Sequence, residues 1–279
     1  REEAEMLARK MTEKQKDGKT IERIEVAGAG FINFWLSKDF ILNNLNEVLR
    51  AGQKWGESDL GRSKTVMVEY FQPNVAKVLH VGHLRSAVIG DALKRIFISQ
   101  GYKAVSDTHV GDWGTQFGIL LYGWRKISEG ERGRIKKDPI EGLNNLYVSE
   151  SRKMENEPER REMAKEEFAK LERGDKENRK AWKWMVDVSM REFLRIISRL
   201  GLLPFEEHKG ESFYENDTSE IAEAALAKGV AEKTGDGAVI VDLTGEGLGG
   251  ADLVKSDGAS TYLLRDLATI RYRIKRWKF

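Results

Sequence analysis

The clearest change of hydrophobic and polar pattern lies between residues 65 and 107. Residues 65–70 (TVMVEY) form a short apolar run, which predicts a buried strand of a parallel sheet. Residues 81–100 then carry apolar positions at helical spacing, and residues 102–107 predict the next strand. This strand–helix–strand unit indicates an α/β fold whose ligands bind at the carboxyl edge of the strands. Residues 108–116 follow the second strand, so we expect them at the same edge.

The N-terminal part predicts a small α+β unit. Its expected elements are a helix over residues 1–20 that ends near Asp17 and Gly18, strands at 21–26 and 31–36 joined by a turn at 28–30, and a helix at 40–49. Ser37 or Asp39 is the candidate N-cap of that last helix, because such side chains accept hydrogen bonds from first-turn N–H groups. Residues 52–64 are polar and predict a linker. We therefore expect a small N-terminal domain at 1–57 and a Rossmann-type α/β domain at 58–279.

The remainder of the chain changes pattern twice. Residues 126–200 are mostly helical in pattern. The elements expected after them are strands at 238–243 and 251–255 and a helix at 262–273. We interpret about 126–250 as a region inserted into this Rossmann-type domain. Acidic and basic residues are equal in number between 150 and 180, which favours a solvated face, with a contact surface as the alternative.

Composition narrows the class of protein. The 279 residues are 40% hydrophobic and 33% charged, and no apolar run approaches the length that spans a membrane. The net charge of +2 gives no general argument for nucleic-acid binding. The absence of cysteine excludes disulfides and thiolate zinc sites and fits a reducing compartment, so we expect a cytoplasmic protein. As a separate expectation, we predict a monomer. The chain begins without methionine and stops directly after a helix-like segment, so we expect a fragment of a longer protein.

Residues 73–83 (PNVAKVLHVGH) carry the strongest chemical signal. They place His80, Gly82 and His83 where a helix begins, and the free N–H groups of a helix start favour phosphate binding. Lys77 adds a cation that can pair with a polyphosphate; the bland alternative is a solvent-facing lysine. The two histidines alone also fit a capped helix start or half of a metal site. With four histidines and no cysteine in the chain, we expect no bound metal.

A second group of polar residues suits a cationic small molecule. Glu69 ends an apolar strand and Asn74 follows in the next turn, although Asn74 alone is more simply explained as a turn residue. Tyr262 and Asp266 are four residues apart on a predicted helix and therefore share a face. Nearby arginines are the alternative partners of Asp266.

Taken together, these segments resemble the arginyl-tRNA synthetases, a family of class I aminoacyl-tRNA synthetases. The matching segments are 68–70 (VEY), 73–77 (PNVAK), 80–86 (HVGHLRS), 109–118 (HVGDWGTQFG), 255–258 (KSDG) with 262–266 (YLLRD), and 27–34 (AGAGFINF). They occur in the family's order and extend over most of the chain. Ala29 stands where a proline is more usual in the family.

The resemblance implies an ATP-dependent ligase. In such an enzyme the arginine carboxylate attacks the ATP α-phosphate, and the arginyl-adenylate is then transferred to tRNA(Arg). The implied partners are therefore ATP, Mg²⁺ carried by ATP, L-arginine and tRNA(Arg), with no membrane. The implied ATP-binding residues are Pro73, His80, Gly82 and His83, with His80, His83 and Lys77 as catalytic phosphate stabilisers. The implied arginine-binding residues are Glu69, Asn74, Tyr262 and Asp266.

Two family parts find no match in the 279 residues. They are the KMSKS-type loop and the helical anticodon-binding domain. Lys77 would partly replace the lysine of the missing loop. We therefore expect the chain as given not to charge tRNA. Two alternatives stay open: a small-molecule nucleotidyltransferase of the wider HxGH superfamily, which needs no carboxylates for a cation, and a non-catalytic paralogue that binds RNA or a protein partner.

Overall fold

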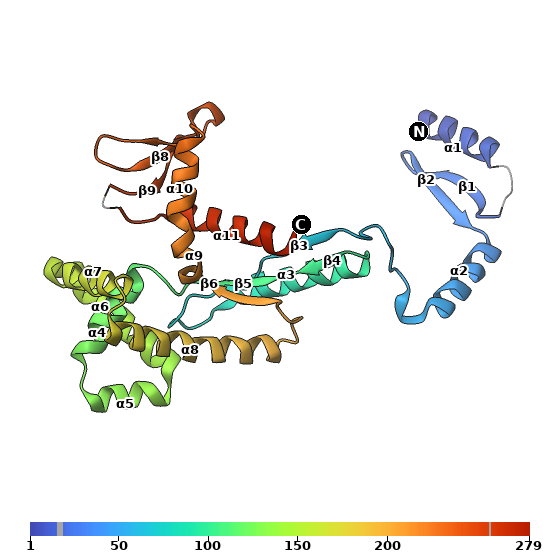
Figure 1. Ribbon diagram of the computed structural model, residues 1–279. Helices are drawn as coiled ribbons and strands as arrows, with labels where there is room; N and C mark the ends of the chain where they lie inside the picture. Colours follow the sequence, from blue (N-terminus) through green and yellow to red (C-terminus); the bar gives the residue numbers. More distant parts are fainter. Residues whose placement is uncertain (16–18, 257) are drawn as a thin grey trace. The chain divides into compact units, whose positions relative to one another are not determined.

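The computed structural model describes residues 1–15, 19–256 and 258–279 (Figure 1). It contains two compact units, Arg1–Ser58 and Asp59–Phe279, and each is described by itself. The predicted helix end near Asp17 and Gly18 lies outside the described residues. Asp257, part of one segment that carries the resemblance, lies outside them as well.

The first unit contains two helices and an antiparallel strand pair, as the pattern predicts. Its elements are α1 (Glu2–Lys14), β1 (Ile21–Ala27), β2 (Phe31–Leu36), α2 (Lys38–Ala51) and the 3₁₀ turn η1 (Gly52–Lys54). Ser37 is the N-cap of α2, since its hydroxyl accepts a 3.1 Å hydrogen bond from the Phe40 N–H. The turn between the strands uses Gly28 at φ 55°, a conformation that glycine adopts without strain.

The second unit begins with the predicted strand–helix–strand unit. Strand β3 (Thr65–Met67) pairs in parallel with β4 (Lys103–Val105), and α3 (Val81–Ser99) connects them (Figure 1). The parallel pairing is confirmed, but the expectation of a buried strand over 65–70 is wrong in length and burial. Among the described residues this sheet has two strands, so β3 lies at an edge and is half-buried.

The predicted strand at 102–107 is divided in two. After β4, the Ser106 N–H donates a 2.5 Å hydrogen bond to the Glu206 carboxylate instead of continuing the pairing with β3. The next strand, β5 (Asp107–Val110), pairs in parallel with β6 (Glu207–Gly210). Directly after β5, Gly111 forms a separate parallel bridge with Asn74 of the loop before α3. The segment at 108–116 therefore starts inside a strand rather than after one.

Five helices follow β5 and contain much of the core. They are α4 (Thr115–Lys126), α5 (Glu129–Lys137), α6 (Pro139–Asn156), α7 (Pro158–Glu172) and α8 (Lys176–Arg199). Phe117, Leu121 and Met185 are at most 1% exposed in one hydrophobic cluster with Leu143 and Leu171. The mostly helical pattern predicted for 126–200 is confirmed.

The last part of the chain packs short strands against two helices. Its elements are α9 (Glu211–Tyr214), η2 (Glu215–Asp217), α10 (Thr218–Ala227), β7 (Glu232–Lys233), β8 (Val239–Asp242), η3 (Thr244–Glu246), β9 (Gly250–Val254) and α11 (Tyr262–Trp277). Strands β7, β8 and β9 form an antiparallel sheet, and Leu253 and Leu264 are buried where β9 meets α11. No helix of the described residues is both long and apolar enough to cross a membrane.

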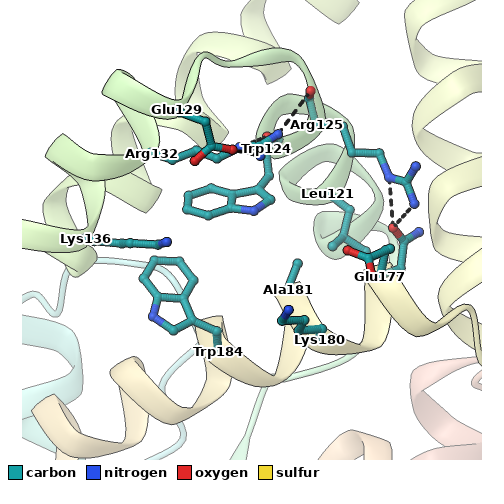
Figure 2. A pocket seen from close by; sticks show the side chains of 11 residues that line it. Leu121, Trp124, Arg125, Glu129, Arg132, Lys136, Glu177, Lys180, Ala181 and Trp184 are labelled. Atoms are coloured by element: carbon teal, nitrogen blue, oxygen red, sulfur yellow. Dashed lines mark hydrogen bonds and ion pairs between the residues drawn. The ribbon is translucent and has the colours of Figure 1, made fainter.

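A cavity of about 580 Å³ lies among α4, α5 and α8 (Figure 2). Trp124 and Trp184 stack beside it with ring centres 4.9 Å apart, and the Arg132 guanidinium lies 5.6 Å from the Trp124 ring centre. Trp124 therefore already has an aromatic and a cationic neighbour within the protein. The described residues that line this cavity include none of the predicted site residues.

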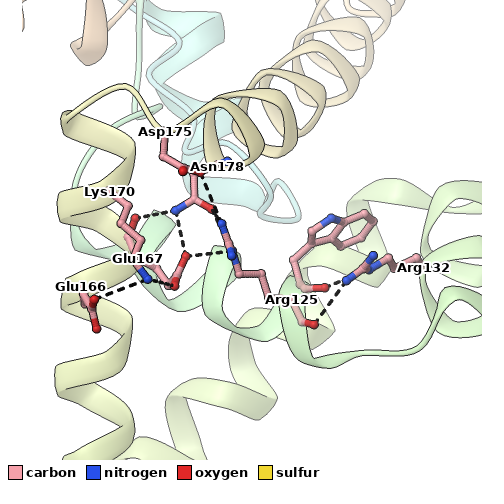
Figure 3. A network of polar contacts seen from close by, with 8 residues as sticks. Arg125, Arg132, Glu166, Glu167, Lys170, Asp175 and Asn178 are labelled. Atoms are coloured by element: carbon pink, nitrogen blue, oxygen red, sulfur yellow. Dashed lines mark hydrogen bonds and ion pairs between the residues drawn. The ribbon is translucent and has the colours of Figure 1, made fainter.

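An ion-pair network joins α4 to α7 and α8 (Figure 3). We define the Arg125 network as Arg125, Glu167, Lys170, Asp175 and Asn178. Arg125 lies 3.0 Å from Glu167 and donates a 2.8 Å hydrogen bond to the Asn178 side-chain oxygen, while Lys170 donates at 2.9 Å to Glu167. Burial raises the pKa of Glu167, but hydrogen bonds from Lys170 and Asn178 and the charge of Arg125 outweigh it, so the pKa lies below its usual value.

Candidate active site

The two signature histidines cap the first turn of α3. The His80 Nδ1 accepts a 3.1 Å hydrogen bond from the Gly82 N–H, and the His83 Nδ1 accepts a 3.2 Å bond from the His80 N–H. The imidazoles therefore act as a reciprocal capping box, with ring centres 4.0 Å apart. A Cβ on Gly82 would lie 2.9 Å from the His80 ring, so glycine lets that ring fold over the backbone.

This capping fixes which histidine nitrogen can contact a ligand. Because Nδ1 accepts a hydrogen bond in both rings, the proton of each neutral imidazole is on Nε2. Burial, followed by the charge of His80, lowers the pKa of His83, which favours its neutral form. Each ring thus has an Nε2–H available to donate to an anionic oxygen at the start of α3.

A cavity of about 450 Å³ lies against this helix start. Its lining includes Phe71, Leu79, His80 and His83, with Arg195 and Arg199 of α8. The walls are mainly apolar, and the polar groups are the imidazoles and the two guanidinium groups. Such a mixture suits a ligand with a flat apolar part and an anionic part.

The loop before α3 is held in a strained conformation. Phe71 and Ala76 have φ of 62° and 59°, a region that residues with a Cβ rarely adopt. The Ala76 N–H donates a 3.0 Å hydrogen bond to the Ser189 hydroxyl of α8. Asn74 is paired with Gly111, where a Cβ would collide with the Asn74 side-chain oxygen. Packing thus fixes Pro73 and Asn74 beside the end of β5. A strained loop conformation persists only where the surrounding structure holds it in this way.

Lys77 lies against the helical region. Its ammonium is 5.1 Å from the ring centre of Tyr147 on α6. This cation–π contact holds the ammonium group beside Tyr147. Because the lysine side chain is flexible, its three N–H donors can still turn toward a ligand. The role predicted for Lys77 stays a prediction.

Glu69 lies two residues beyond the end of β3 and already has protein partners. One carboxylate oxygen accepts a hydrogen bond from Arg273 of α11, and the other accepts one from the Gln72 amide. The side chain stays 28% exposed. Arg273 also donates to Asp107 at the start of β5, at 2.9 and 2.8 Å.

Asp266 approaches the same region from α11. Its carboxylate oxygen is 4.0 Å from the His109 Nε2, and its side chain is 63% exposed. Burial lowers the pKa of His109, and the charges of Glu69 and Asp266 oppose this shift without outweighing it. Tyr262 is 71% exposed, with its ring 4.8 Å from the Arg265 guanidinium.

The nearby arginines do not neutralise Asp266. Arg265 lies 3.3 Å from Glu211, and Arg271 pairs with Glu220. Among the described contacts, Asp266 therefore has His109 as its neighbour at 4.0 Å, which forms an ion pair only when the imidazole is protonated.

The sequence reasoning missed Arg273 and Asp107 and gave His109 and Asp112 no role. Asp107 lies within the predicted strand 102–107, and a carboxylate buried in a strand needs a cationic partner, which was the available signal. Asp112 has a structural role, since its carboxylate accepts 2.8 and 2.6 Å hydrogen bonds from the N–H and hydroxyl of Ser212. Among the described residues no cluster of three or more His, Asp or Glu could hold a metal ion.

Family comparisons agree with these local features. Residues 44–279 match the family model for the catalytic domain of class I tRNA synthetases (R), and residues 1–36 match the arginyl-tRNA synthetase N-terminal domain. The chain is 38% identical to an arginine–tRNA ligase of Lactococcus lactis subsp. lactis and 39% identical to one of Ligilactobacillus salivarius. Both alignments include 100% of this chain and 49% of the relative, so the chain spans about half the length of these curated relatives.

Solved structures give the same answer for the fold. An arginyl-tRNA synthetase from Plasmodium falciparum is similar with a TM-score of 0.66 and 28% identity, over 91% of this chain and 44% of that chain. One from Thermus thermophilus has a TM-score of 0.67 at 21% identity, over 98% of this chain and 45% of that chain. The mixed α/β fold with parallel strand pairs, the signature at the start of α3 and the family matches lead to one conclusion: this chain belongs to the arginyl-type class I tRNA synthetase family.

Proposed function

We propose that this chain contributes the arginine site and part of the ATP site of an arginine–tRNA ligase. The observation that carries the proposal is that Arg273 joins Glu69 to the start of β5 while Asp266 comes within 4.0 Å of His109 on the same strand, next to the loop that leads into α3. A guanidinium stays protonated and presents a planar fork of donors, for which carboxylates are the natural acceptors. Family membership supports the same assignment.

In this proposal the histidines stabilise phosphate rather than transfer protons. The Nε2–H groups of His80 and His83 donate to ATP phosphate oxygens, with Pro73 and Gly82 shaping the approach and Lys77 adding a cation. Mg²⁺ arrives with ATP. The arginine carboxylate oxygen attacks the α-phosphorus, the bond to the β-phosphate oxygen breaks, and pyrophosphate leaves. No protein nucleophile is needed, because positioning and charge stabilisation lower the barrier.

The substrate arginine is held by Glu69, Asn74, Tyr262 and Asp266. Asp266 and Tyr262 are exposed enough to meet a ligand, at 63% of the side chain and 71% of the residue. Asn74 is fixed beside Gly111 and presents an amide that can both donate and accept. Transfer of the activated arginine to tRNA(Arg) completes the proposed reaction.

The domain assignment is part of the same proposal. Residues 1–57 are the small N-terminal domain and 58–279 belong to the catalytic domain, into which about 126–250 are inserted. The proposed protein is a cytoplasmic monomer.

Arginine binding tests the proposal. Isothermal titration of L-arginine into this chain should show binding, and Asp266→Ala should weaken it at least about tenfold, since a charge-assisted hydrogen bond contributes roughly 1.5–3 kcal/mol. Asp187→Ala is the matched control, because Asp187 is exposed on α8 and pairs with Lys183. Absence of arginine binding, or an unchanged affinity in Asp266→Ala, would contradict the assignment and favour a nucleotidyltransferase or a non-catalytic module.

A further inference from the structure

Arg273 is the most buried cation that contacts a predicted substrate residue. Its side chain is 6% exposed, and its Nε and one terminal nitrogen donate to the two oxygens of Asp107 at 2.9 and 2.8 Å. Asp107 itself is fully buried. The second terminal nitrogen donates to Glu69. The planar guanidinium thus joins the start of β5 to the residue that follows β3.

Glu69 is therefore held from two directions. Arg273 donates to one oxygen and the Gln72 amide donates to the other. A carboxylate has about four lone-pair sites, so each oxygen keeps a further acceptor position. The Glu69 side chain is 28% exposed, which leaves these positions accessible.

We propose that Arg273 is a positioning residue, which uses its fork on Asp107 to fix the Glu69 carboxylate in the orientation that binds substrate arginine. This inference rests on the proposed function. Arg273 contacts two carboxylates with one positive charge, so these three groups keep a surplus negative charge for a cationic ligand. We define Arg273, Asp107, Glu69 and Gln72 as the Arg273 network.

The fork geometry explains why arginine is required at this position. A guanidinium supplies parallel donors to Asp107 and a third donor, in the same plane, to Glu69. A lysine ammonium keeps the charge but lacks that planar fork. Arg273→Lys should therefore preserve charge while releasing the orientation of Glu69.

The opposite hypothesis is that Arg273 competes with the substrate. Its guanidinium has the same chemistry as that of free arginine. In this hypothesis Arg273 occupies the position on the Glu69 carboxylate that the substrate guanidinium needs. Competition predicts tighter arginine binding after substitution, whereas positioning predicts weaker binding. A purely structural role predicts lower stability with unchanged affinity of the folded protein.

The test is a double-mutant cycle on arginine affinity, measured by titration calorimetry. Arg273→Lys should weaken binding roughly tenfold in the wild-type background and have little effect when Glu69→Gln is already present, because the two residues act through one contact. Arg276→Lys is the matched control. Arg276 is one turn later on α11 and pairs with Glu207 at 2.7 Å. Thermal unfolding of every variant is recorded separately.

The outcomes separate this inference from the function on which it rests. If wild type does not bind arginine, the proposed function fails and this inference fails with it. If wild type binds but Arg273→Lys binds equally or more tightly, or weakens binding equally in the Glu69→Gln background, only the positioning role is overturned.

A second variant covers the case in which Arg273→Lys does not fold. Arg273→Gln combined with Asp107→Asn removes both buried charges together, so no isolated charge remains in the interior. This pair should also weaken arginine binding roughly tenfold, because Glu69 loses the same donor. Unchanged affinity in this folded variant would overturn the positioning role.

Discussion

The Arg125 network and the Arg273 network each place one arginine between carboxylates, but burial is reversed. In the Arg125 network the arginine side chain is 45% exposed and Glu167 only 10% exposed. In the Arg273 network the arginine is 6% exposed and Glu69 is 28% exposed. Glu167 is surrounded by donors from Arg125, Lys170 and Asn178, so it acts as an internal support (Figure 3). Glu69 is instead held by Arg273 and Gln72 and keeps acceptor positions that solvent can reach.

This difference shows that an ion pair can either stabilise the packing of helices or orient a group that binds a ligand. A buried carboxylate with several donors has little acceptor capacity left, and its network holds helices together. A buried arginine that supports a partly exposed carboxylate produces an oriented acceptor at a surface. Which member of the pair is buried is therefore more informative than the presence of the pair.

Removing the buried arginine should have the largest effect on stability. Arg273→Ala leaves Asp107 as an unpaired buried carboxylate, so the free energy of unfolding should fall by roughly 3–5 kcal/mol. Arg276→Ala on the same helix should change it by less than about 0.5 kcal/mol, because that side chain is 56% exposed. Denaturant unfolding of both variants makes the measurement, and equal losses would refute the distinction.

The pH dependence of the Glu211–Arg265 pair provides a further test of how burial affects a carboxylate beside an arginine. Burial raises the pKa of Glu211 to about 7, despite the charge of Arg265. The unfolded carboxyl ionises near its ordinary value of 4.5, so the folded state loses relative stability as pH rises from 4.5 through 7. Glu211→Gln should remove this loss. Between pH 4.5 and pH 8, the free energy of unfolding should therefore fall by roughly 1–3 kcal/mol less in the variant than in the wild type. Chemical denaturation at both pH values measures it; an identical pH dependence in the variant would contradict the shift.

The exposed arginine of the Arg125 network should matter least. Arg125→Ala should lower the free energy of unfolding by only about 1 kcal/mol, because Glu167 keeps its donors from Lys170 and Asn178. Arginine affinity should not change, since this network belongs to the helical region. Unfolding and calorimetry on one protein preparation check both statements. A loss as large as that of Arg273→Ala would remove the contrast between the networks.

Local pattern predicted the elements better than it predicted their partners. The first unit and the strand–helix–strand unit follow from periodicity and caps, as with Ser37 at the start of α2. The division between β4 and β5 did not, because it depends on Glu206, which is 100 residues from Ser106. The same limit applies to Arg273, whose partner Asp107 is 166 residues away.

The site was predicted unevenly for the same reason. His80 and His83 are close in sequence, so their cap geometry follows from local spacing. The contacts of Arg273 with Glu69 and Asp107, and of Asp266 with His109, require α11 to pack against the strands. Sequence spacing alone carries no such information, and here the family resemblance indicated the grouping.

Ligand selectivity tests the central claim most directly, because the account assigns guanidinium recognition to partly exposed carboxylates. L-Citrulline has the same length and shape as L-arginine but a neutral urea group. Calorimetric titrations of the wild-type chain should show arginine binding at least about 100-fold more tightly than citrulline, a difference of roughly 2.8 kcal/mol. Equal affinity for the two amino acids would show that the carboxylates do not read the charge, and would contradict the account.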